Sequence, residues 1–297
     1  MMGSAKLQNI DLPPMPQVVS KILQIEESNI DVSSDQLQAI VAVDPALTSK
    51  ILKIANSAFY ARSNKVTSLS QAITLLGFKT IKSLTLLVSS ASLFPRHRRS
   101  NKVQKELWMR SVLSALIAKI ICEQLGRRNL RDEAFMAALL KDMGMMILNN
   151  QFTETYGMIF YQADHGLDVK KLRELEKKEL GVSGPEVSEL AMQRWNFPAE
   201  LYELAKLEHW EIDVSYDEKN PLVLPVIMAG ILVILGGYTE YTQNLKPEWH
   251  NYYHNIFENY ASHLKLEARQ KSFFLNDLKA RIAEDSFYSF CEELFSM

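Results

Sequence analysis

Residues 44–58 read DPALTSKILKIANSA, a stretch whose periodicity indicates the fold class. Its apolar side chains recur at spacings of four, three, one and three, which places on one helical face Leu47, Ile51, Ile54, Ala55 and Ala58. Asp44 is positioned to cap the helix, and Pro45 stands at the first helical position, where its missing N–H costs nothing. The stretch therefore predicts an amphipathic α-helix with a defined start.

The same periodicity runs through the rest of the chain. Ser68 and Gln71 form a capping box for a helix over 69–76, which Gly77 can close. Helices are further predicted at Val103 to Leu125, Asp132 to Leu148, 152–163, 169–180 and 183–195, with three more from Leu222 to the end. No alternating strand, Gly-rich phosphate loop or internal repeat is evident. The predicted fold class is all-α, a bundle of many helices.

Composition excludes several classes of protein. Apolar residues make up 47% of the 297 residues, enough for a sizeable core. A formal charge of -2 and a pI near 6.3 argue against a dedicated nucleic-acid binder. The two cysteines, Cys122 and Cys291, are far apart, so no disulfide framework or zinc site is expected. These features favour a reducing compartment, and we expect the cytoplasm.

The apolar run from Leu222 to Leu235 is the strongest candidate for a membrane span. It is shorter than the roughly 18 residues that a span needs, and it contains Pro225 and Gly230. We therefore expect a buried core helix and no membrane association.

A polar, basic stretch from Pro95 to Lys102 divides the chain. It is short and lacks interleaved aromatics, so it is better interpreted as a solvated linker than as a nucleic-acid contact. We expect an N-terminal lobe at about 11–94, a second lobe at about 101–210, and a C-terminal helical extension (211–297) packed on the second lobe.

Two sets of ordered motifs carry a family resemblance. In the second lobe, residues 107–111, 138–144, 181–187 and 205–209 resemble the HD superfamily of metal-dependent phosphohydrolases. In the first lobe, residues 12–16, 43–48, 54–60 and 72–77 resemble the HDOD domain, an HD-related output domain of bacterial signalling proteins. The resemblance covers roughly Asp11 to Trp210. It implies a regulatory role, with partners among two-component or cyclic-dinucleotide pathway proteins.

The sequence departs from the metal-binding pattern at nearly every ligand that the resemblance implies. Arg110, Lys141 and Gly184 stand at histidine positions, and Gly230 stands at the late aspartate. Arginine offers a metal no lone pair, and lysine is a cation by default. The remaining donors, Asp142 and His209, cannot complete the six or so ligands of Mg²⁺ or Mn²⁺. We therefore expect no metal, no other cofactor and no enzymatic activity.

The remnant site allows three interpretations. Arg110 and Lys141 replace the lost metal charge and pair with Asp142. Alternatively, the two cations form a pocket for a phosphate-bearing ligand, or Asp142 lies exposed and unpaired. The predicted remnant-site pocket comprises Arg110, Lys141, Asp142 and His209.

A cluster of aromatic residues near the C-terminus is the candidate contact surface for a partner. It comprises Trp249, Tyr252 and Tyr253, and it surrounds His250 and His254. The two histidines lack a clear third ligand, so a metal site is not favoured. The mixed charge run from Lys170 to Glu179 is predicted to be a solvated helix face.

These observations predict a non-catalytic signal-transduction module that acts by binding other proteins. A metal-dependent phosphohydrolase is the first alternative. A sensor that binds a nucleotide or phosphate ligand in the remnant pocket is the second.

Overall fold

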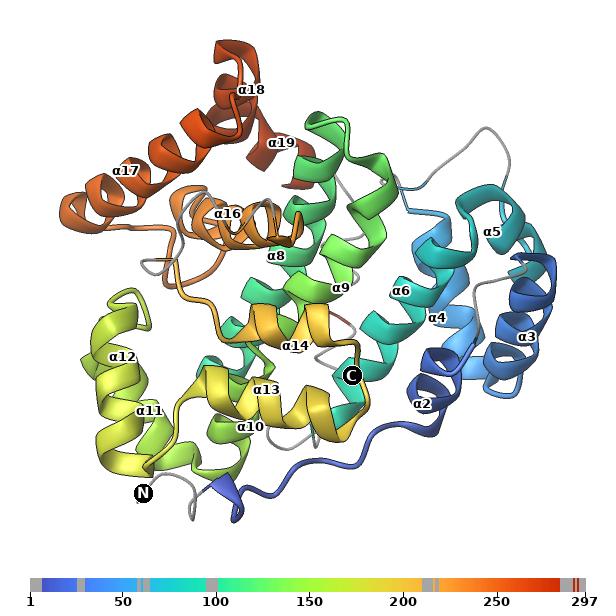
Figure 1. The fold of residues 1–297 in the computed structure, drawn as a ribbon, viewed down its shortest axis with the longest axis horizontal. Coiled ribbons are helices and arrows are strands. Elements are labelled where there is room, and N and C mark those ends of the chain that lie inside the picture. Colours follow the sequence, from blue (N-terminus) through green and yellow to red (C-terminus); the bar gives the residue numbers. More distant parts are fainter. Residues whose placement is uncertain are drawn as a thin grey trace. The chain divides into compact units, whose positions relative to one another are not determined.

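The computed structural model describes residues 7–25, 30–57, 60, 65–94, 101–209, 216, 219–283, 291 and 293. Every regular element among these residues is helical and none is a strand, which confirms the all-α prediction (Figure 1). The chain divides into two compact units, each built from two separate segments. Unit 1 comprises residues 1–13 and 97–279, and unit 2 comprises residues 14–96 and 280–297. Residues 95–100 of the predicted linker and Trp210 lie outside the described residues.

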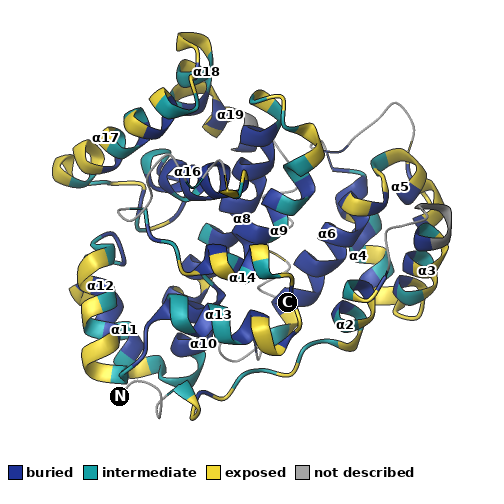
Figure 2. Ribbon diagram, in the orientation of Figure 1, coloured by how far each residue is buried: buried dark blue, intermediate teal, exposed yellow. Residues whose placement is uncertain are grey.

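Unit 2 is organised around one buried helix. Helix α6 (Phe78–Ser90) is buried along almost its whole length, and it contacts the other α-helices of the unit (Figure 2). These are α2 (Gln17–Leu23), α3 (Ile30–Ala42), α4 (Pro45–Ala55) and α5 (Leu69–Leu76), and a 3-10 turn, η1 (Ala91–Leu93), follows α6. The predicted caps form as expected. Asp44 Oδ1 accepts the N–H groups of Ala46 at 2.9 Å and Leu47 at 3.0 Å, and Ser68 Oγ accepts that of Gln71 at 3.2 Å.

Asn56 ties the end of α4 to the segment before α5. Its Nδ2 donates to the carbonyl oxygens of Leu52 and Val66, both at 2.8 Å. Its Oδ1 accepts the N–H of Val66 at 2.9 Å. Asn56 thus satisfies backbone groups that the helix end leaves open, so its role within unit 2 is structural.

Unit 1 is built on the long helix α8 (Lys102–Gln124), whose side chains are buried from Val103 to Cys122 with few exceptions. Helices α9 (Arg131–Lys141) and α16 (Val223–Leu235) pack against α8. The remaining elements of unit 1 are η2 (Arg128–Leu130), α10 (Met143–Gln151), α11 (Thr153–Gln162), α12 (Val169–Leu175), η3 (Glu176–Leu180), α13 (Gly184–Arg194), α14 (Ala199–Ala205), α17 (Pro247–His263), α18 (Ala268–Ser272) and η4 (Phe273–Asp277). The last helix, α19 (Leu278–Ala283), begins in unit 1 and ends in unit 2.

Helix α16 confirms the prediction of a core helix at 222–235. Eleven of its 13 residues are buried. Across the described part of the chain, no helix combines the length and apolar character that crossing a membrane requires.

The single helix predicted from Asp132 to Leu148 is wrong. The chain leaves helical geometry at Asp142 (φ −101°, ψ 17°), which separates α9 from α10. Apolar residues continue on both sides, but α9 packs mainly on α8 whereas α10 packs mainly on α13. Because the two segments pack against different helices, they need different axis directions, and the break at Asp142 allows the chain to change direction.

The C-terminal residues predicted to form an extension divide between the two units. Helices α16 and α17 belong to unit 1, whereas residues 280–297 group with unit 2. Within unit 2, Lys53 Nζ lies 2.7 Å from Glu293 Oε2, and Cys291 is buried. The apolar surface of α16 explains its place, because α8 and α9 cover it.

Candidate functional site

A cavity of about 110 Å³ lies in unit 1, and all four residues of the predicted remnant-site pocket line it. Arg110 comes from α8, Lys141 and Asp142 from the end of α9, and His209 from the segment after α14. Part of the wall is apolar and comes from α16, including Val226, Ile227, Ile231 and Ile234. The fold therefore brings together the four residues that the sequence motifs predicted to form one pocket.

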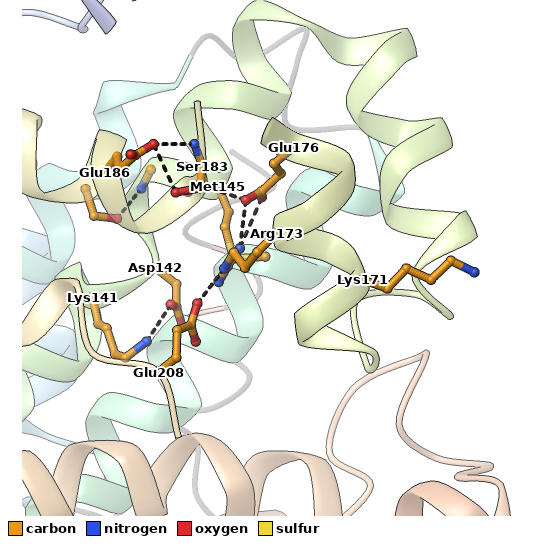
Figure 3. A network of polar contacts seen from close by, with 12 residues as sticks. Lys141, Asp142, Met145, Lys171, Arg173, Glu176, Ser183, Glu186 and Glu208 are labelled. Atoms are coloured by element: carbon orange, nitrogen blue, oxygen red, sulfur yellow. Dashed lines mark hydrogen bonds and ion pairs between the residues drawn. The ribbon is translucent and has the colours of Figure 1, made fainter. Parts of the chain in front are cut away.

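Asp142 is paired with its neighbour in the sequence. Lys141 Nζ donates to Asp142 Oδ1 at 3.1 Å (Figure 3). Burial raises the pKa of Asp142, but the charges of Lys141, Arg173 and Arg110 outweigh it and lower that pKa overall. The Asp142 side chain keeps 40% of its accessible surface although protein surrounds it, because it faces the cavity. Asp142 is thus an ionised carboxylate on the cavity wall, and the interpretation of an unpaired Asp142 is wrong.

Arg110 pairs with a different carboxylate from the one expected. Its Nε donates to Glu106 Oε1 at 2.7 Å, one helical turn earlier, and its Nη2 donates to the carbonyl oxygen of His165 at 3.1 Å. Thr239 Oγ1 donates to the same Glu106 oxygen at 2.5 Å. Because Glu106 lies at i−4 on the same helix, it is the nearer partner for the guanidinium. Arg110 therefore affects Asp142 by charge and not by a direct hydrogen bond.

Arg173 is the site residue that sequence reasoning missed. Its Nε donates to Glu208 Oε1 at 2.5 Å, and its Nη1 lies 3.1 Å from both carboxylate oxygens of Glu176 (Figure 3). Glu176 is fully buried and also accepts hydrogen bonds from the Tyr156 hydroxyl at 2.6 Å and the Gly184 N–H at 2.8 Å. The prediction of a solvated face for 170–179 is thus wrong for Arg173 and Glu176. Val169, Leu172, Arg173 and Glu176 share one helical face, and this spacing was the available signal.

The residues at this site do not fit a divalent metal of the HD type. A Cβ atom built on Gly184 would lie 2.7 Å from Met145 Cγ and 3.1 Å from Arg173 Nη1, so a histidine side chain has no room there. Gly230 offers no donor. Within the described ranges, no three His, Cys, Asp or Glu side chains gather as a metal site would require. Arg173 and Met145 occupy the space next to Gly184.

The loop between α11 and α12 forms another part of the wall. Asp164, His165 and Gly166 follow one another with φ of 50°, 59° and 75°, a left-handed run that costs free energy at the two non-glycine residues. Arg110 holds the loop through the His165 carbonyl, and Trp249 Nε1 and Lys246 Nζ donate to Asp164 Oδ2 at 2.5 and 2.8 Å. A strained loop is therefore fixed by α8 and by residues at the start of α17.

The predicted aromatic contact surface is wrong in one member. Tyr253 is 1% exposed, lines the cavity and donates from its hydroxyl to the Leu167 carbonyl at 2.7 Å. It belongs to the buried stripe of α17 with Phe257 and Tyr260. Tyr252 stays exposed, and Trp249 is partly exposed.

The histidine pair on α17 has no third ligand beside it among the residues that the structure describes. His250 and His254 stack with ring centroids 5.9 Å apart. Glu258, one turn later, accepts a hydrogen bond from Lys271 Nζ at 2.6 Å.

His209 is held neutral by its surroundings. Burial, assisted by the positive charges of Lys141 and Arg173, lowers the pKa of His209 to about 4, although Glu208 acts in the opposite direction. Its Nε2 lies 3.0 Å from the Tyr252 hydroxyl. In the unfolded chain the pKa of His209 has the ordinary histidine value near 6.5, so the unfolded chain binds a proton at His209 more readily than the folded chain does.

We therefore expect stability to fall as the pH is lowered from about 6.5 towards 4. Between these values the unfolded state binds more protons, so the free energy of unfolding rises with pH in this window. The contribution of His209 is on the order of 2 kcal/mol, discounted for partial exposure. Urea unfolding of the wild type and of His209→Gln across pH 4–7 measures it. The variant should show the shallower pH dependence, and equal slopes would contradict the prediction.

Comparison with known proteins gives one family. The family model of the HDOD domain matches residues 12–211. An uncharacterized protein of Treponema pallidum is 23% identical over 233 residues, covering 77% of this chain and 44% of that protein. The chain thus spans less than half the length of this curated relative.

Three solved structures share the fold. An HDOD domain protein of unknown function from Geobacter sulfurreducens superposes with a TM-score of 0.72 at 21% identity, covering 100% of this chain and 98% of that one. A proposed phosphohydrolase from Shewanella amazonensis gives 0.68 at 18% identity, with 99% and 98% covered. A proposed signal transduction protein from Marinobacter aquaeolei gives 0.62 at 16% identity, with 95% and 65% covered.

Proposed function

The chain belongs to the HDOD domain family, and from this premise we propose that it is a non-catalytic signalling module that acts by binding other proteins. The observation that carries the proposal is the charge at the remnant site. Where the HD resemblance implies metal ligands, Arg110 and Lys141 supply fixed positive charge, and the Arg173 guanidinium occupies the space beside Gly184. Cations already neutralise Asp142 and Glu208, so a divalent ion would have to displace them.

The phosphohydrolase alternative needs a bound metal and is disfavoured by this donor set. The nucleotide-sensor alternative is disfavoured by size. A cavity of about 110 Å³ is well below the roughly 300 Å³ at which pockets for drug-sized ligands begin. The named relatives do not decide between these functions, since one is a proposed phosphohydrolase and another a proposed signal transduction protein. Signalling partners of the two-component or cyclic-dinucleotide kind fit the family, and Tyr252 with Trp249 is the proposed contact surface.

The first test concerns catalysis. We expect purified protein to contain no stoichiometric Mn, Fe or Mg, and to hydrolyse neither phosphodiesters nor phosphomonoesters when these metals are added. Lys141→His is the matched variant, because it restores the His-Asp pair and leaves Arg110, Gly184 and Gly230 unchanged. It should remain inactive, since one histidine does not complete the ligand set. About one transition metal per chain, lost in Asp142→Asn together with turnover, would overturn the proposal.

The second test concerns binding to other proteins. Tagged protein incubated with extract of its native cells should retain a signalling protein, and Tyr252→Ala should lower the amount retained. Tyr161→Ala is the control, because Tyr161 is 48% exposed and lies on α11. Equal retention by both variants would remove Tyr252 from the contact surface.

A further inference from the structure

The cavity wall carries polar groups with unused hydrogen-bonding capacity. Lys141 Nζ has three hydrogens and donates one of them to Asp142 Oδ1. Asp142 Oδ2 and Arg110 Nη1 make no hydrogen bond to any residue in the described part of the chain. Arg110 Nη1 lies beside Gly166, which also lines the cavity. Two cationic donors and one carboxylate acceptor therefore remain available to a guest.

The charges of the wall are close to balanced. Among the described lining residues, three cations (Arg110, Lys141, Arg173) face two carboxylates (Asp142, Glu208), and Glu106 and Glu176 stand behind the two arginines. An anion alone would leave Asp142 Oδ2 without a donor, and a cation alone would leave the Arg110 and Lys141 donors without an acceptor. Desolvating a polar group without giving it a partner is costly. A guest with a carboxylate and an ammonium group gives hydrogen-bond partners to Arg110, Lys141 and Asp142, and it adds no net charge.

The rest of the wall limits the size and polarity of the guest. Val226, Ile227, Ile231 and Ile234 of α16 form an apolar surface. An apolar cavity of about 150 Å³ accommodates benzene, which has six non-hydrogen atoms, so the smaller volume of 110 Å³ here admits no more than about six. The guest therefore carries at most a short apolar side chain.

We propose that this cavity is a binding site for a small zwitterion, an amino acid of about the size of alanine. Its carboxylate accepts hydrogen bonds from Arg110 Nη1 and Lys141 Nζ, its ammonium donates to Asp142 Oδ2, and its methyl group contacts α16. The site goes beyond the proposed function and does not depend on whether the protein is catalytic. A module of this kind would report the concentration of a small metabolite to its protein partner.

Calorimetric titration tests the proposal with alanine and with two smaller probes that each keep only one of its charged groups, propionate and ethylamine. Alanine should bind with a dissociation constant of about 10 µM to 1 mM, as suits six non-hydrogen atoms. Propionate and ethylamine, which each lack one charged group, should bind at least tenfold more weakly. Propionate or ethylamine binding as tightly as alanine, or no binding by alanine, would overturn the proposal.

Two variants locate the site. The nearest atom to a Cβ built on Gly230 is Ser114 Oγ at 3.9 Å, so Gly230→Val fits and fills part of the cavity. It should weaken alanine binding at least tenfold. Gly157→Val on α11 is the matched control, because a Cβ there meets no atom within 4 Å and Gly157 does not line the cavity. Unchanged binding in Gly230→Val would place the site elsewhere and contradict the proposal.

Asp142→Asn separates a zwitterion site from a general anion site. The substitution keeps the shape of the side chain and removes its negative charge, so alanine should lose affinity and propionate should gain it. An Asp142→Asn variant that binds alanine as tightly as the wild type would show that the ammonium does not contact Asp142, and would overturn the assignment.

Discussion

Arg173→Met should lower the free energy of unfolding by about 3–5 kcal/mol, the range found when one partner of a buried ion pair is removed. Arg173 is the shared cation of Glu176, which is fully buried, and of Glu208, whose side chain is 8% exposed. Methionine is comparable in length and apolar, so the expected loss comes from charge and not from a cavity. Urea unfolding followed by circular dichroism at pH 7 measures the difference.

The control for Arg173→Met lies five residues further along the chain. Lys178 pairs with Glu179 at 3.1 Å, but its side chain is 76% exposed, so Lys178→Met should change stability by less than about 0.5 kcal/mol. Equal effects of the two variants would contradict the role assigned to Arg173.

Gly144→Ala should destabilise the protein by about 3 kcal/mol or more. A Cβ built on Gly144 would lie 2.0 Å from the Gly184 carbonyl oxygen and 2.5 Å from the Ser188 backbone nitrogen. Both contacts are with backbone, which cannot turn aside, so α10 and α13 would have to separate. Separation would also break the 2.7 Å hydrogen bond from the Gly144 N–H to Ser188 Oγ.

Gly157→Ala is the matched substitution for this second prediction. Gly157 lies within α11 and a Cβ there meets nothing within 4 Å, so alanine should stabilise the helix by about 0.5–1 kcal/mol. In thermal unfolding, Gly144→Ala should therefore lower the melting temperature and Gly157→Ala should raise it. If Gly144→Ala also stabilises the protein, the backbones of α10 and α13 do not come as close to each other as these distances indicate.

Local chemistry made much of the fold predictable. Caps such as Asp44 and Ser68 act on backbone groups two or three residues away, so their role is visible in a short stretch of sequence. The break at Asp142 is different. The apolar pattern continues across it, and only the exchange of packing partners from α8 to α13 requires it.

The candidate site was predictable where a motif fixed the position, as for Lys141 and Asp142. Arg173 does not stand out in the sequence because it lies in a mixed run of five cations and three carboxylates that is typical of a solvated helix face, although only the residues in register with Leu172 turn inward. Tyr253 resembles Tyr252 in residue type and position, so composition alone does not separate the two. Its spacing to Phe257 and Tyr260, four and then three residues, marks the buried face of α17.

The separation of α8 and α16 along the chain has a consequence during biosynthesis. Helix α16, which lines the cavity and packs on α8 and α9, begins at Val223, beyond residue 211 where the family match ends. A ribosome therefore completes α8 about a hundred residues before it delivers the helix that shields it, which at 5–20 residues per second takes roughly 5–20 s. During that interval the apolar side chains of α8 and α9 that α16 covers in the folded protein lack this cover. This is a window in which a nascent chain of this protein is open to chaperones and to aggregation.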